Sequence, residues 1–227
     1  MASVLITGAN RGLGLEFARQ YAGEGWRVFA TCRDPARAEA LRRLSGEVTV
    51  HRLDVGKFDE VRALAGELDS EPIDLLINNA GVYGGRPQDL ESLDYGVWAE
   101  VLRIDCVAQI HVAHAFLEPV ARSRRKIIVA MSSGMGSIAD NTSGGAYIYR
   151  SSKAALNAAM KSLAIDLAPK GITVAVLHPG WAKTEMGGAG ALIGADESVA
   201  GMRAVIDRLG PADAGGFFRY DGSTIPW

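Results

Sequence analysis

The sequence predicts an α/β fold: a single doubly wound parallel sheet of about seven strands with helices on both faces, formed by one domain over residues 1–227. Short β-branched, apolar runs alternate with longer stretches of helical period, as in chains built from strand–helix–strand units. Runs such as LLI, IIV and VAV lack polar alternation, which is typical of strands covered on both faces. With 227 residues, 48% of them hydrophobic, the chain can bury the core that this fold needs.

Strands are expected, in chain order, at the runs rich in β-branched and apolar residues: Ser3–Thr7, Arg27–Thr31, Val48–Leu53, Ile73–Ile77, Lys126–Met131, Ile172–Leu177 and Gly216–Tyr220. Helices are expected between them, from apolar residues at helical spacing: Gly12–Gly23, Pro35–Leu44, Lys57–Leu68, Asp94–Arg122, Ala146–Ala168 and Asp196–Leu209. The second helix has a clear start, because Asp34 can cap it and Pro35 fits its first turn. The glycine-rich GGAGALIGAD predicts a mobile substrate loop at 182–196.

A glycine-rich turn, TGANRGLG, joins the first strand to the first helix. Its glycines, at 8, 12 and 14, allow a sharp turn and the close approach of a ligand to the backbone. The helix that follows presents free N–H groups and a positive dipole end to a pyrophosphate. Because the motif opens a strand–helix–strand unit, we favour a Rossmann-type dinucleotide site over a turn that binds nothing.

The second strand ends VFATCRD, which bears on the choice of dinucleotide. Cys32 stands where a carboxylate would bind the ribose 2′-hydroxyl of NAD, and Arg33 follows it. Arg33 and Arg11 together could hold the 2′-phosphate of NADPH, so NADP is favoured over NAD. Asp34 could instead turn inward and accept the 2′-hydroxyl. Asp54, after the third strand, is a candidate for the adenine ring or for a helix cap.

Polar groups also follow the fourth, fifth and sixth strands, in LLINNAG, IIVAMSSGMGS and VLHPGWAKTEM. In an open α/β sheet this edge is where ligands bind. The stretch AYIYRSSK then opens a helix, where residues four apart share a face and residues six apart do not. Tyr149 rather than Tyr147 should therefore meet Lys153. A nearby ammonium lowers the pKa of a phenol and suits it to acid–base catalysis.

Composition excludes several other classes. The formal net charge is −2, and the densest basic patch, Arg122 to Lys126, is interpreted as a solvated turn, so no nucleic-acid partner is expected. Two cysteines, Cys32 and Cys106, indicate a reducing compartment. No secretory signal and no apolar run of about 18 residues is evident, so we expect a soluble, cytoplasmic protein without membrane partners. His111 and His114 lack a third ligand, so no metal site is expected.

The motifs TGANRGLG, NNAG, YRSSK and HPG, with a serine-bearing strand end before YRSSK, occur in the order typical of short-chain dehydrogenases/reductases. The chain resembles that family over nearly its whole length. Within it, TCRDP, SSGMGSI, HPGWAKTEMGG and DGSTIPW are similar to the C-factor and sniffer-like carbonyl reductases.

This resemblance implies the roles of the candidate catalytic residues. Tyr149 would be the general acid in carbonyl reduction, Lys153 would lower its pKa and bind the nicotinamide ribose, and Ser133 would hold the carbonyl oxygen. Ser132 would be structural. Because the spacing from Ser133 to Tyr149 is long for the family, an enlarged loop is expected at Ala139–Gly145, and Ser137 stays an alternative.

One position departs from the family. Asp105, in VLRIDCVA, stands where the family has an asparagine whose backbone carbonyl holds a water that links the lysine to solvent. An aspartate keeps that carbonyl but brings a carboxylate near Lys153, which could reduce the effect of the ammonium on Tyr149. The proton relay is therefore expected to be altered.

The resemblance also implies a cofactor site, in which Asn79–Gly81 shape the pocket and Thr184 holds the carboxamide. The full set of expected cofactor-binding residues is Gly8, Asn10, Arg11, Gly12, Leu13, Gly14, Arg33, Asp54, Val55, Asn79, Ala80, Gly81, Tyr149, Lys153, Pro179, Gly180 and Thr184. The expected function is NADPH-dependent reduction of an aldehyde, ketone or quinone by a homodimer or homotetramer packed through the 94–122 and 146–168 helices. The alternative is a dinucleotide-binding signalling or regulatory protein with little turnover.

Overall fold

A seven-stranded parallel sheet forms the centre of the computed structural model, which describes all residues 1–227. The strands lie in the order β3-β2-β1-β4-β5-β6-β7. Their bounds are β1 Ser3–Ile6, β2 Arg27–Cys32, β3 Val48–Arg52, β4 Leu75–Asn78, β5 Ile127–Met131, β6 Thr173–His178 and β7 Phe217–Arg219. Every neighbouring pair is parallel, which confirms the doubly wound fold.

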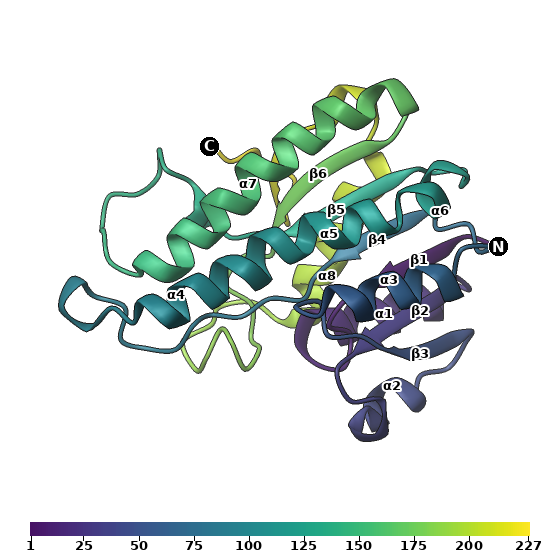
Figure 1. Cartoon of the computed structure of the whole chain (residues 1–227), viewed down its shortest axis with the longest axis horizontal. Coiled ribbons are helices and arrows are strands. Elements are labelled where there is room, and N and C mark those ends of the chain that lie inside the picture. Colours follow the sequence, from purple (N-terminus) through teal and green to yellow (C-terminus); the bar gives the residue numbers. More distant parts are fainter.

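Helices cover both faces of the sheet (Figure 1). They are α1 Gly12–Gly23, α2 Glu39–Arg42, α3 Phe58–Glu67, α4 Tyr95–Leu102, α5 Ala108–Ala115, α6 Leu117–Ala121, α7 Tyr147–Leu167 and α8 Ala195–Arg208. One buried core packs α3, α5 and α7 on one face through residues such as Val61, Val112 and Met160. A second core packs α1 and α8 on the other face through residues such as Phe17 and Met202.

Two expected helices are interrupted. The predicted 35–44 helix divides at Ala38 into a 3-10 turn, Pro35–Arg37, and the short α2. The predicted 94–122 helix contains a π-helical turn, Arg103–Val107, and breaks at Phe116. The break is explained by Pro119, which has no N–H to donate and whose ring would clash with the carbonyl four residues earlier in a continuous helix. The π-helical turn carries Asp105, and such turns are frequent at functional sites.

The helices expected to mediate self-association expose apolar side chains. Tyr95 on α4 and Ile165 on α7 are 73% and 64% exposed. Assembly as a homodimer or homotetramer stays a prediction. No helix combines the length and the apolar character needed to cross a membrane. No three His, Cys, Asp or Glu side chains gather as a metal site would require.

Candidate active site

A cleft of about 600 Å³ opens where the carboxyl ends of β1 and β4 meet, at the point where the order of the strands reverses. All the expected cofactor-binding residues except Gly180 line it. Gly180 turns away, since a side chain there would meet Ile193 and Tyr220. The cleft is also lined by Asp34, which the sequence offered as an alternative ligand of the ribose. Its other lining residues were not expected as ligands: Cys32, Arg37, Leu53, Val82, Ile104, Met131, Ser132, Glu185 and Met186.

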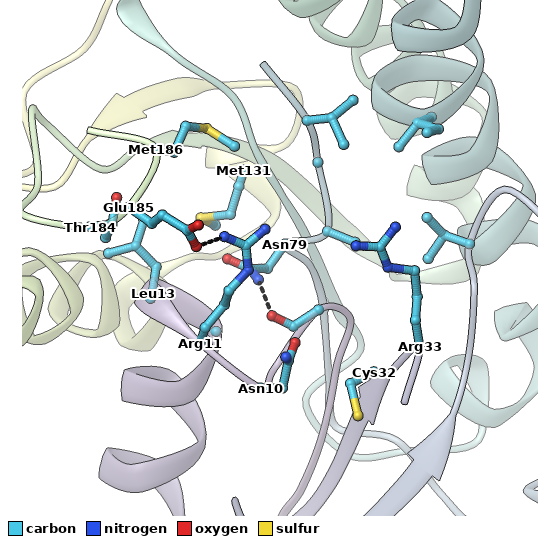
Figure 2. Close-up of a pocket in the computed structure, with 18 of the residues that line it drawn as sticks. Asn10, Arg11, Leu13, Cys32, Arg33, Asn79, Met131, Thr184, Glu185 and Met186 are labelled. Atoms are coloured by element: carbon cyan, nitrogen blue, oxygen red, sulfur yellow. Dashed lines mark hydrogen bonds and ion pairs between the residues drawn. The ribbon is translucent and has the colours of Figure 1, made fainter. Parts of the chain in front are cut away.

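The glycine-rich turn is fitted closely to the rest of the cleft. Gly8 has φ +66°, and a Cβ on it would lie 3.0 Å from the Cα of Ala80. The Asn79 amide donates to the carbonyl oxygens of Thr7 (2.8 Å) and Gly8 (3.1 Å), so the β4 turn holds the loop (Figure 2). No side chain caps the start of α1, and no acidic residue lies in its first turn. Its free N–H groups therefore fit the pyrophosphate of a dinucleotide.

The arginines of the cleft differ in their surroundings. Arg11 pairs with Glu185 across the cleft, whereas Arg33 lies on the other side of Asn10 (Figure 2). In this arrangement Arg11 is engaged by an acid, and the expectation that Arg11 and Arg33 bind one phosphate together stays a prediction. Arg37, on the 3-10 turn after β2, lines the cleft with Arg33, and neither has an ion-pair partner. The sequence analysis did not identify Arg37, although its position four residues after Arg33 could have indicated that it lies near the same site.

The two aspartates with open alternatives both make local turns. The Asp34 carboxylate accepts the backbone N–H of Ala36 at 3.1 Å, so it caps the 3-10 turn. Asp54 accepts the N–H of Gly56 at 3.0 Å and also lines the cleft. A carboxylate engaged in this way is less available to a ribose hydroxyl. This favours Arg33 over Asp34 as the residue that binds at the 2′ position of the ribose.

Tyr149 and Lys153 lie together at the edge of the cleft, on the first turns of α7. The Lys153 Nζ is 5.6 Å from the centroid of the Tyr149 ring, and both residues are buried. Tyr147 is 39% exposed on another side of the helix. The spacing argument that selected Tyr149 over Tyr147 is confirmed by this geometry. Whether Tyr149 is the catalytic acid stays a prediction.

The pKa of Tyr149 differs from the expectation. Burial raises the pKa of the phenol and outweighs the Lys153 ammonium, which lowers it. Asp105 adds to the increase, whereas the Ser133 side chain favours the phenolate. The expected net decrease is therefore absent. The neutral phenol, which is the form that can donate a proton, predominates at neutral pH.

Asp105 makes the contact with Lys153 that the sequence suggested. Its Oδ2 lies 3.1 Å from the Lys153 Nζ, and its Oδ1 accepts the N–H of Val82 at 2.8 Å. Burial disfavours the ammonium, but Asp105 and Tyr149 more than compensate, so the pKa of Lys153 is raised. Lys153 also donates to the carbonyl oxygen of Met131 at 3.2 Å. The lysine is therefore held as a cation in an ion pair with a buried carboxylate.

The three serines after β5 have different surroundings. Ser132 donates to Asn157 Oδ1 at 2.6 Å, so its hydroxyl hydrogen is already used in a buried hydrogen bond. Ser137 donates to the carbonyl oxygen of Pro226 at 2.6 Å, which commits it to the C-terminal segment. The Ser133 hydroxyl accepts the N–H of Met135 at 3.1 Å, so its own hydrogen remains available. Ser133 is thus the serine best placed to donate to a ligand beside Tyr149.

The comparison with known proteins decides the family. The family model described as short chain dehydrogenase matches residues 2–190. This chain belongs to the short-chain dehydrogenase family. It is 44% identical to the C-signal of Myxococcus xanthus over 167 residues, which are 74% of this chain and 100% of that protein. It is 31% identical to the 1-hydroxy-2-glutathionyl-2-methyl-3-butene dehydrogenase of a Rhodococcus species, with both chains fully covered.

Solved structures that are similar to this dehydrogenase include carbonyl reductases. Sniffer of Drosophila melanogaster is 35% identical, with a TM-score of 0.94 and 100% of both chains covered. The NADPH-bound carbonyl reductase of chicken fatty liver is 34% identical, with a TM-score of 0.92, and the match covers 100% of this chain and 99% of that one. The similarity extends over the whole fold.

Two residues near the phenol of this dehydrogenase were missed in the sequence. The Tyr83 ring packs on Tyr149, with centroids 4.7 Å apart and planes tilted by 35°. The Gln88 side chain is buried and accepts the backbone N–H of Tyr149 at 3.0 Å. Tyr83 lies two residues after the NNAG turn, which offered a weak signal. Gln88 lies in an irregular segment with no periodic pattern, so only the fold brings it to Tyr149.

The substrate loop expected at 182–196 lines the cleft through Thr184, Glu185 and Met186. A short bridge joins Ala182 to Ile193, and the Thr184 side chain lies against Gly12 of the glycine-rich turn. Trp181, just before this loop, is 53% exposed and donates to the carbonyl oxygen of Gly187 at 2.8 Å within the loop. The mobility of the loop stays a prediction.

His178, at the end of β6, should make the stability of the dehydrogenase depend on pH. Burial, with a smaller contribution from Arg219, lowers the pKa of His178 to about 4. Because the unfolded chain binds this proton near pH 6.5 and the folded chain only near 4, stability is complete above 6.5 and falls as the pH decreases. We expect the wild type to lose about 2 kcal/mol more unfolding free energy than His178→Gln between pH 7.5 and 5. Denaturant titrations at both pH values check this, and equal losses would contradict it.

Proposed function

We propose that this dehydrogenase is an NADPH-dependent carbonyl reductase that converts an aldehyde, ketone or quinone to the alcohol. The observation that carries the proposal is the buried Tyr149, in contact with Lys153 and Ser133 at the edge of a cleft that fits a dinucleotide. On the opposite side of that cleft, Arg33 and Arg37 are free to bind a phosphomonoester. A small-molecule substrate would bind between Tyr149 and the 182–196 loop.

The chain's own groups would perform the proton transfer. Ser133 donates a hydrogen bond to the carbonyl oxygen and holds it beside the phenol of Tyr149. As negative charge develops on that oxygen, Tyr149 gives up its proton, and Lys153 stabilises the resulting phenolate. Bound NADPH supplies the hydride to the carbonyl carbon, so that one carbonyl, one NADPH and one proton give one alcohol and one NADP⁺.

The preference for NADPH is supported by charge and by the relatives. The chicken carbonyl reductase is described as NADPH-bound, and a carbonyl reductase of Pseudomonas aeruginosa, 32% identical with a TM-score of 0.85, is described in complex with NADP. No carboxylate of this chain is free at the end of β2, because Asp34 caps the following turn. Arg33 and Arg37 would therefore meet the 2′-phosphate without competition from an acid.

The test is the oxidation of NADPH by the purified protein against a panel of aldehydes, ketones and quinones, followed at 340 nm. Turnover of at least one class, with NADPH preferred to NADH, is the expected result. NADPH binding measured by calorimetry, with no turnover on any carbonyl, would refute the reductase.

The Asp105 carboxylate should set the pH range of the reaction. Asp105→Asn keeps an oxygen for the N–H of Val82 but removes the charge that opposes Lys153, so the pKa of Tyr149 should fall. Alcohol oxidation needs the phenolate, which is present above that pKa. Oxidation should therefore extend to lower pH, with a rate at pH 7 about tenfold higher than that of the wild type.

A pH–rate profile of the reverse reaction checks this, with the exposed Asp166→Asn on α7 as the matched control. An unchanged profile in Asp105→Asn, or the same shift in Asp166→Asn, would contradict the role given to the Asp105 charge.

A second function, dinucleotide-dependent signalling or regulation, is favoured by two features. The Lys153–Asp105 ion pair reduces the positive charge available to Tyr149, and the similarity to the C-signal is high. A regulator would bind NADPH tightly and turn over slowly with every carbonyl, whereas a reductase would be saturated by at least one of them. The substrate panel distinguishes the two.

A further inference from the structure

The helix that carries Tyr149 has no cap of its own. Ala146 occupies the N-cap position of α7 in the left-handed conformation, with φ +47°, and makes no side-chain hydrogen bond. No acidic residue lies in the first turn of α7. The first N–H groups of the helix therefore need an acceptor from elsewhere in the chain.

Gln88 supplies that acceptor from a distant segment. Its Oε1 accepts the N–H of Tyr149 at 3.0 Å, and its backbone oxygen accepts the N–H of Tyr147 at 3.4 Å. The side chain is buried, with 6% of its residue surface exposed, so water cannot readily replace these contacts. The bond is made to the backbone of the predicted catalytic residue itself.

The other end of the same amide holds the segment that packs beside the phenol of Tyr149. Gln88 Nε2 donates to the carbonyl oxygens of Tyr83 at 2.7 Å and Gly85 at 2.9 Å. The Tyr83 ring in turn packs against the Tyr149 ring at 4.7 Å. One buried amide therefore connects both the backbone of Tyr149 and the segment whose aromatic ring contacts its phenol.

We propose that Gln88 is a positioning residue, which holds Tyr149 and the Tyr83–Gly85 segment as one unit on the substrate side of the site. The inference rests on the proposed reductase function. It assigns the two halves of the amide different tasks: the oxygen positions the proton donor, and the nitrogen positions the wall that a substrate contacts. A misplacement of about 1 Å in such a site can cost on the order of 10²-fold in rate.

Two substitutions separate the tasks. Gln88→Met keeps the length of the side chain but removes both hydrogen-bonding ends, so kcat should fall about tenfold to a hundredfold with NADPH affinity unchanged. Gln88→Glu keeps an acceptor for Tyr149 but repels the carbonyl oxygens of Tyr83 and Gly85. It should mainly raise the KM for the carbonyl and retain most of kcat.

Gln20→Met is the matched control, since it removes glutamine hydrogen bonds within α1 and to α8, on the face of the sheet opposite α7. It should leave kcat and KM unchanged. Wild-type kcat and KM in Gln88→Met would overturn the proposal. It would also be overturned if both Gln88 variants changed the same parameter equally, because the amide would then have no separate tasks.

Hydrogen–deuterium exchange tests the inference independently of turnover. In Gln88→Met, the amides of residues 147–152 should exchange at least about tenfold faster than in the wild type and in Gln20→Met. If the wild type reduces no carbonyl, the proposed function fails, and exchange alone then decides whether Gln88 holds α7. Equal exchange in all three proteins would overturn the positioning role.

Discussion

Replacing Tyr149 with phenylalanine should lower kcat for carbonyl reduction by about 10³-fold, within the range that general acids contribute. The phenol is the proton donor nearest to Ser133 and Lys153, and phenylalanine keeps the ring that packs on Tyr83. The affinity for NADPH should change little, because the glycine-rich turn, Lys153 and the arginines stay in place. Steady-state kinetics with a saturating carbonyl, together with calorimetric NADPH binding, measure both quantities.

Tyr147→Phe is the control for this variant. Tyr147 lies two residues earlier on α7, on a more exposed side, and is remote from Lys153 by the geometry of the helix. Its replacement should leave the rate at the wild-type value. Equal losses in the two variants, or a Tyr149→Phe enzyme with nearly full activity, would remove Tyr149 from the mechanism.

Replacing Arg33 with aspartate should reverse the choice of dinucleotide. A charge-assisted hydrogen bond contributes about 1.5–3 kcal/mol, and the new carboxylate would repel a 2′-phosphate, so the ratio of NADPH to NADH efficiency should fall at least about 100-fold. The ratio of kcat/KM for the two cofactors measures this with one carbonyl. Arg37 would still favour NADPH, so complete discrimination against it needs both substitutions.

Arg43→Asp provides a control of equal charge change near the same site. Arg43 follows α2, is exposed and pairs with Glu39 at 3.0 Å outside the cleft. It should shift the cofactor ratio only through weak, salt-screened electrostatics. If Arg33→Asp shifts the ratio no more than Arg43→Asp does, the 2′-phosphate is bound elsewhere.

The regular elements could be predicted because their signals are local. Helix α1 begins and ends where its apolar period and its glycines indicated, at Gly12 and Gly23. Each of the seven expected strands is present within two residues at either end. Two predicted helices were too long, because in each of them a single residue interrupts a helix that the apolar spacing would continue. Pro119 interrupts one, and Ala38 leaves the helical conformation in the other.

The sequence by itself determined the parallel doubly wound sheet, the edge of the sheet at which the site lies, and the pairing of Tyr149 with Lys153. These follow from chain connectivity and helical spacing, which act between residues close in sequence. Only the tertiary structure decided that Arg11 pairs with Glu185, that burial outweighs the effect of Lys153 on the pKa of Tyr149, and that Gln88 caps α7. Desolvation and contacts between distant segments depend on the complete packing, so no local pattern encodes them.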